Sequence, residues 1–153
     1  SLCSPVVTLN GADVTDEIRS ERVSLASSKI AKYTSVRKKL IDFQRKFSRG
    51  HGLIADGRDM GSVIFPSADL KIFLTASVKV RADRRYKELI ARGENVSLRD
   101  LERRIALRDK GDRERKVSPL IAGEGAIVID ASEKSVNEVK KEIIHYFDLI
   151  PSV

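Results

Sequence analysis

The stretch Gly52-Leu53-Ile54-Ala55-Asp56-Gly57-Arg58-Asp59-Met60-Gly61 decides the fold class of this chain. Its first half is a short apolar run that closes on a carboxylate and a glycine. Buried parallel strands have this form when they deliver polar groups at their carboxyl ends. The runs LKIFLT at 70–75 and AIVID at 126–130 repeat the pattern. With helical spacing in between, the sequence predicts an α/β fold with a parallel sheet and flanking helices.

Helical spacing of apolar residues and capping signals predict five helices around these strands. Before the first of them, residues 6–11 predict a strand that runs into a turn. We expect helices from about Ser20, after Thr34 until Gly50 and Gly52, after Ser77 until Gly93, after a Ser97/Asp100 cap, and after a Ser135/Glu138 capping box. On the second helix, one apolar face should hold Val36, Leu40, Phe43 and Phe47.

The composition indicates an anionic ligand. The chain has 153 residues, 41% of them hydrophobic, and a formal net charge of +7. A basic chain of this kind favours nucleic acids, nucleotides or other phosphate esters as partners. With one cysteine, Cys3, no intrachain disulfide can form, and we expect a reducing, cytoplasmic compartment. No apolar run is long enough to predict a membrane span.

The first candidate site follows the run at 52–56. Gly57 permits a sharp turn, and the planar guanidinium of Arg58 suits a phosphate. Asp59 can accept hydrogen bonds from sugar hydroxyls or an exocyclic amine. An ordinary surface turn has the same composition, so these residues alone leave both readings open.

The second candidate site is the charged stretch Arg108-Asp109-Lys110-Gly111-Asp112-Arg113-Glu114-Arg115. If it is helical, Arg108, Asp112 and Arg115 share one face. Two cations around one acceptor suit a phosphoryl-transfer site. A solvated helix with internal ion pairs is the better interpretation of a charge run in isolation, although Gly111 costs helix stability without benefiting such a surface.

Other polar residues give weaker signals. Arg81, Arg84 and Arg85 form either a solvated face or a contact surface for ATP, and for Arg81 the solvated face is favoured. Ser28 and Arg37 are unremarkable by themselves. His51 and His145 lack the spacing of metal ligands, so no metal site is expected.

Taken together, these residues resemble the bacterial cytidylate kinases, a family of nucleoside monophosphate kinases. The segment 52–66 looks like the signature of that family. The KIFL run at 71–74, the RADRRY run at 81–86, and 108–115 followed by Ser-Pro-Leu also fit. Residues 11–19 resemble an insert in the monophosphate-binding region of the family. The resemblance covers about residues 6–149.

The resemblance implies a fold and a set of roles. The fold is a P-loop NTPase-type parallel sheet with flanking helices, with residues 1–49 in the monophosphate-binding region. Residues 50–83 and 117–153 would form the core and 84–116 a helical lid. The implied reaction is ATP-dependent phosphorylation of CMP or dCMP, with Mg²⁺ bound to ATP, by a protein that is a monomer when intact and binds neither nucleic acid nor membrane. The implied substrate-binding residues are Ser28 at the base, Arg37, Arg58 at phosphate, Asp59 at sugar, Arg108, Asp112 and Arg115; Arg108, Arg115 and Asp56 would serve catalysis, and Arg84, Arg85 and Arg113 would contact ATP.

One departure from the family is large. The family begins with a strand and a G-x-x-x-x-G-K-[ST] loop that cradles the ATP phosphates, and the sequence holds no such run. Since the strand belongs in the middle of the sheet, we expect the parent polypeptide to extend before Ser1, or another chain to supply this piece. Two alternatives remain open. The chain is a catalytically inactive nucleotide-binding fragment, or it is a basic nucleic-acid-binding module, which Asp59, Asp112 and the scarcity of aromatic residues disfavour.

Overall fold

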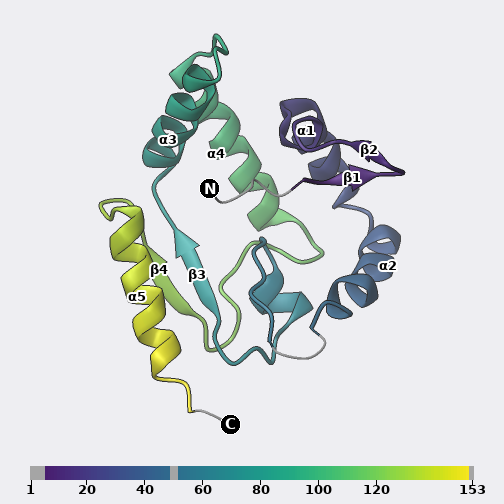
Figure 1. Cartoon of the computed structure of the whole chain (residues 1–153), viewed down its shortest axis with the longest axis vertical. Coiled ribbons are helices and arrows are strands. Elements are labelled where there is room, and N and C mark those ends of the chain that lie inside the picture. The colour runs from purple at the N-terminus through teal and green to yellow at the C-terminus, as the bar shows by residue number, and fades with distance from the viewer. Residues whose placement is uncertain (1–5, 49–51, 152–153) are drawn as a thin grey trace. The chain divides into compact units, whose positions relative to one another are not determined.

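The computed structural model describes residues 6–48 and 52–151 and divides them into two compact units, one up to Phe47 and one from Ser48. Figure 1 shows the elements along the chain. The first unit holds β1, β2, the short 3₁₀ helix η1, α1 and α2, which span Thr8–Leu9, Ala12–Asp13, Glu17–Arg19, Glu21–Ile30 and Thr34–Arg45. The second holds the π-helix η2, β3, α3, α4, β4 and α5, which span Met60–Ile64, Ile72–Thr75, Val78–Ala91, Leu98–Glu114, Ile127–Asp130 and Val136–Asp148.

In the first unit, β1 and β2 form an antiparallel hairpin in which Leu9 pairs with Ala12. The two residues between them, Asn10 and Gly11, both have positive φ, which is the geometry that a tight two-residue hairpin turn requires. The predicted helices from Ser20 and after Thr34 are confirmed as α1 and α2. However, α2 ends at Arg45, before the predicted glycines, so Phe47 lies beyond the helix and packs edge-on against Phe43.

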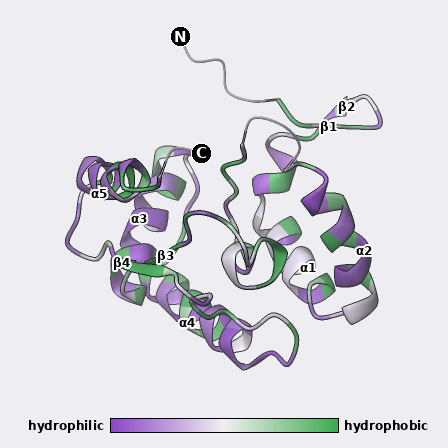
Figure 2. Cartoon of the chain, turned by 90° about the horizontal axis from the view of Figure 1, so that it is seen from below, coloured by the Kyte–Doolittle hydropathy of each residue, from purple (hydrophilic) through white to green (hydrophobic). Residues whose placement is uncertain are grey.

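In the second unit, β3 and β4 are parallel neighbours, with Ile72 opposite Ile127 and Thr75 opposite Asp130. The helices α3, α4 and α5 begin after Ser77, Ser97 and Ser135, and in each case the serine side chain accepts a hydrogen bond from the backbone three residues on. All three helices and their caps confirm the sequence-based predictions. In Figure 2, most of β4 is hydrophobic, and the strand ends on Asp130.

The predicted strand at 52–56 is wrong. Within the part of the chain that the structure describes, these residues form no strand, and Ile54 is fully exposed. A strand exists only when a neighbouring strand pairs its backbone groups, and β3 and β4 pair only with each other. The apolar run therefore remains an extended, unpaired segment leading to Arg58.

The buried core of the second unit lies between α3 and α4 and at the end of β4. Ala82, Leu89 and Leu101 form one buried cluster, which Tyr86, Val96 and Ile105 flank. At the end of β4, Ile129 and Ala131 are buried. Just beyond the ends of β3 and β4, the hydroxyl of Ser132 accepts a hydrogen bond from the Ser77 amide. This junction fixes the start of α3 at the carboxyl edge of the sheet.

Candidate phosphate-binding site

Asp112 is the centre of the candidate site. Its side chain is 9% exposed, and three arginines lie around it. Arg115 Nη1 lies 3.4 Å from Asp112 Oδ1, and Arg108 Nε lies 3.9 Å from Asp112 Oδ2. Arg58 Nη1 forms an ion pair with Asp112 Oδ2. Arg108, Asp112 and Arg115 thus share one face as predicted, but Arg115 does so from just past the helix and not from within it. Arg58 joins this face from a segment 50 residues before Arg108 in sequence.

Arg115 reaches this face although it lies just past the helix. It has an extended backbone, with φ −68° and ψ 138°, as the cap residue of α4. Its Nε donates to the carbonyl of Ser118, a buried residue with a φ of 50°. The loop after α4 therefore turns back toward the helix end, and the amide of Leu120 donates to the Asp112 carbonyl at 2.8 Å.

A second buried carboxylate, Asp109, lies one helical turn before Asp112. Its Oδ2 accepts a hydrogen bond from Arg81 Nη2 at 2.5 Å, and its Oδ1 lies 3.9 Å from Arg58 Nη1. Sequence reasoning placed Arg81 on a solvated face, whereas the structure places it against this carboxylate. Arg81 and Asp109 are 28 residues apart in sequence, so helical spacing could not reveal their pairing. The only signal in the sequence was that Asp109 and Asp112 share one face of a helix.

The cluster carries more positive than negative charge. Arg58, Arg81, Arg108 and Arg115 face two carboxylates, which leaves a formal excess of two positive charges among these six groups. Burial and the neighbouring Arg58 lower the pKa of Arg108, while Asp112 and Asp109 raise it. Arginine remains protonated at neutral pH despite such a shift. A guanidinium cation that burial and a like charge disfavour is stabilised by an added anion.

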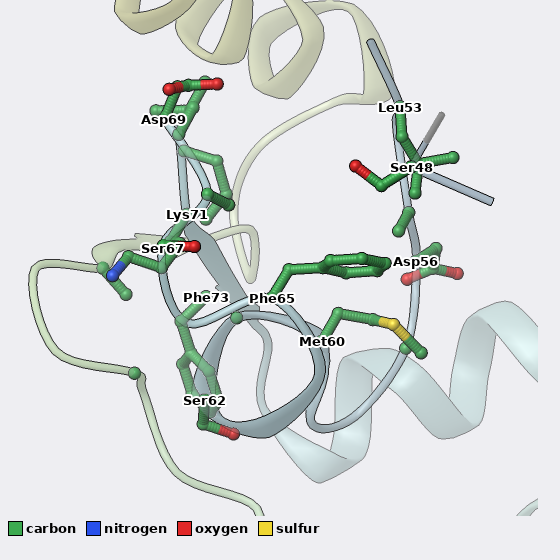
Figure 3. A pocket seen from close by; sticks show the side chains of 18 of the residues that line it. Ser48, Leu53, Asp56, Met60, Ser62, Phe65, Ser67, Asp69, Lys71 and Phe73 are labelled. Atoms are coloured by element: carbon green, nitrogen blue, oxygen red, sulfur yellow. The ribbon is translucent and has the colours of Figure 1, made fainter. Parts of the chain in front are cut away.

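Arg58 also borders a cavity of about 330 Å³ in the second unit. Figure 3 shows Met60 and Phe65 projecting into it, Asp56 at one side, and Asp69 and Lys71 toward the other. Asp56, the predicted catalytic carboxylate, is exposed and lines this cavity. Asp59 is buried and directly precedes the π-helix Met60–Ile64, without a side-chain hydrogen bond to its first turn; π-helical turns are frequent at functional sites.

The remaining predicted site residues lie outside this cluster. Arg84 donates to the carbonyls of Ala131 and Lys134, at 2.7 and 3.3 Å, and so ties α3 to the segment after β4. Arg85 pairs with Glu88 on the same helix, and Arg113 is exposed on α4.

Ser28 and Arg37 belong to the first unit. Ser28 is half-buried on α1, and Arg37 donates to the Ala31 carbonyl at 3.2 Å. Of the residues that sequence analysis set aside, Cys3 and His51 lie outside the described residues. Within 6–48 and 52–151 no group of three or more acidic, histidine or cysteine side chains could hold a metal, and no helix is long and apolar enough to cross a membrane.

Comparison with known proteins identifies relatives over almost the whole chain. The family model described as cytidylate kinase matches residues 1–149. Curated proteins named cytidylate kinase are similar: that of Nitrosococcus oceani is 47% identical over 138 residues, covering 90% of this chain and 61% of the relative. That of Colwellia psychrerythraea is 49% identical over 140 residues, covering 92% and 62%. That of Methylococcus capsulatus is 50% identical over 133 residues, covering 87% and 60%. The chain thus spans about three fifths of the length of these relatives.

Proposed function

Because this chain belongs to the cytidylate kinase family, whose fold is of the P-loop NTPase type, we propose that it supplies the nucleoside-monophosphate-binding and lid residues of an ATP-dependent CMP kinase. The observation that carries the proposal is the convergence of Arg58, Arg108 and Arg115 on one buried carboxylate. A phosphate monoester carries a charge of about −1.5 to −2 at neutral pH, which matches the excess positive charge of the cluster.

In the proposed reaction, an oxygen of the CMP phosphate attacks the γ-phosphorus of ATP, and ADP leaves. Such transfer depends on positioning and charge neutralisation far more than on a general base. Arg58 holds the accepting phosphate, while Arg108 and Arg115 neutralise charge on the transferring group. Asp112 holds these guanidinium groups together and oriented before the nucleotides bind.

The other predicted residues complete the proposal. Asp59 binds the sugar, and Asp112 helps to place it; Ser28 faces the base, and Arg37 contacts the base or phosphate of CMP. Asp56, in the lining of the cavity, is the carboxylate near the Mg²⁺ that ATP brings. Arg84, Arg85 and Arg113 face ATP, which for Arg84 requires release from the Ala131 carbonyl.

The binding part of the proposal is tested by titrating CMP, dCMP and cytidine into the protein by calorimetry. Arg58→Ala removes a charge-assisted contact to phosphate, so CMP should bind about thirtyfold more weakly, on the order of 2 kcal/mol, and cytidine as before. Arg99→Ala removes the same charge from an exposed position on α4 and serves as the control. Equal losses of CMP and cytidine affinity in Arg58→Ala contradict the assignment.

The catalytic part of the proposal predicts a division of labour. Residues 1–153 include no G-x-x-x-x-G-K-[ST] loop, so by themselves they should bind CMP without forming ADP from ATP and CMP. A coupled assay for ADP measures this directly. Turnover by residues 1–153 at the rate of an intact kinase means that the ATP phosphates are held elsewhere than we propose.

A further inference from the structure

The two buried aspartates of α4 bind different partners. Asp112 contacts the three arginines assigned above to phosphate, whereas Asp109 bonds mainly to Arg81, which the proposed reaction does not use. Asp109 is only 7% exposed, so its charge is stable there only because it is paired. A buried ion pair that stands next to a binding site, yet outside it, needs its own explanation.

Arg81 links this carboxylate to the sheet. Its Nε donates to the carbonyl of Ala76 at 2.9 Å, and its Nη2 donates to Asp109 Oδ2 at 2.5 Å. Ala76 directly follows β3, so a single planar guanidinium connects the carboxyl end of the sheet to the face of α4. The bond to Ala76 fixes the Arg81 guanidinium, and its second bond holds Asp109 Oδ2 in place.

The other oxygen of Asp109 faces Arg58, at 3.9 Å from its Nη1. Arg58 thus lies between two carboxylates that belong to successive turns of α4. Its side chain is 34% exposed, so a ligand can still reach it. With Asp112 as its only partner, Arg58 would share one carboxylate with Arg108 and Arg115, and its plane would be less defined.

We propose that Asp109 and Arg81 are positioning residues, which fasten α4 to the carboxyl end of β3 and hold the Arg58 guanidinium in place for the phosphate of its ligand. The inference rests on the proposed function for the identity of that ligand. The contacts that link Ala76 to Arg81, Arg81 to Asp109 and Asp109 to Arg58 do not depend on which ligand binds.

Asp109→Asn in the full chain tests the inference, since it keeps the shape of the side chain and removes its charge. Two measurements are made: CMP and cytidine affinity by calorimetry, and the Arg58 Nε–H signal by NMR. We expect CMP affinity to fall about tenfold, cytidine affinity to stay unchanged, and the Arg58 signal to move or broaden. Asp109→Glu should restore part of the CMP affinity. Asp83→Asn breaks the exposed Lys87–Asp83 pair on α3 and is the matched control.

Arg81→Lys provides a second variant, because it keeps the charge but loses the fork between Ala76 and Asp109. We expect it to alter the Arg58 signal as Asp109→Asn does, and the double variant to lose no more CMP affinity than either single one. Additive losses, or an Arg58 signal unchanged in both variants, overturn the inference. If the unmodified protein binds no CMP, the proposed function fails, and the Arg58 signal alone still decides whether Asp109 and Arg81 position this side chain.

Discussion

At the scale of single residues, the site has fewer carboxylates than arginines, because two aspartates lie among four arginines. Asp112 alone is near three guanidinium groups, from the segment after residue 56, from α4 and from the loop after α4. Burial of like charges is costly unless each has a partner. The two aspartates therefore hold the cluster together, and we expect the phosphate of the proposed ligand to supply the missing negative charge.

Gly123 lines the cavity that Arg58 borders and lies close to the backbone of Gly61. A Cβ at position 123 would lie 2.5 Å from the Gly61 carbonyl oxygen and 2.9 Å from its carbon, and backbone cannot yield as a side chain can. Gly123→Ala should therefore lower the free energy of unfolding by about 1–3 kcal/mol. Chemical denaturation measures this value.

Gly61→Ala is the control for this prediction. The nearest atom that its Cβ would meet is Lys71 Cγ at 3.2 Å, a contact that a small shift of this side chain relieves. Its cost should be clearly smaller. Equal stability losses in the two variants would show that the close backbone approach does not limit packing here.

At the scale of elements, the helices are specified locally and the sheet is not. The starts of α3, α4 and α5 were predicted from Ser77, Ser97 and Ser135, since a capping side chain bonds within three residues of itself. The run at 52–56 has the composition of a strand as clearly as 126–130 has, but a strand also needs a partner, which composition does not reveal.

The same division applies to the site. The shared face of Arg108 and Asp112 follows from helical spacing and was predicted; Arg115 was predicted there as well, but it reaches Asp112 from the residue after the helix. The approach of Arg58 to that face was expected only through the family resemblance, and the pairing of Arg81 with Asp109 was missed. Both join residues distant in sequence, and such contacts depend on how α3, α4 and the segment after residue 56 pack together.

The capping box of α5 predicts a pH dependence of stability. Hydrogen bonds from the Ser135 hydroxyl and amide lower the pKa of Glu138 below 4.5. A carboxylate with a depressed folded-state pKa stabilises the fold above its unfolded pKa, and this contribution is lost as the pH falls through the folded value. Glu138→Gln should therefore melt at a lower temperature than the unmodified chain at pH 7.

Melting curves recorded between pH 7 and pH 3 test this prediction. The difference between the two proteins should shrink below about pH 4.5, where the unfolded-state carboxyl begins to bind its proton, and should vanish once Glu138 is protonated in both states. Glu133→Gln, a charge removed from just before the box, is the control. A difference that is the same at every pH means that the charge of Glu138 plays no part in the cap.

At the scale of the whole molecule, the question is which part moves when nucleotides bind. We expect residues 84–116 to act as a lid, because Arg104, Arg108, Arg113 and Arg115 concentrate positive charge that Asp112 balances only in part, and bound phosphates complete that balance. The apolar cluster of Ala82, Leu89 and Leu101 lies between α3 and α4, so these helices should move as one piece. Bending is then expected at Gly111, which follows the part of α4 that packs on α3 and where a side chain would meet nothing within 4 Å.

Hydrogen exchange with and without CMP and an ATP analogue tests this expectation. Amides near Leu89 and Leu101 should be protected in both states, since the α3–α4 packing persists. Amides from 105 to 116 should exchange faster without ligand and gain protection with it, because the arginines around Asp112 and Asp109 then acquire the phosphate that balances their charge. Gly111→Ala favours the straight helix by about 1 kcal/mol and should reduce the unliganded exchange at 105–116. Strong protection across 84–116 that nucleotides leave unchanged would identify a static helix pair, and the two aspartates would then hold a permanently closed site.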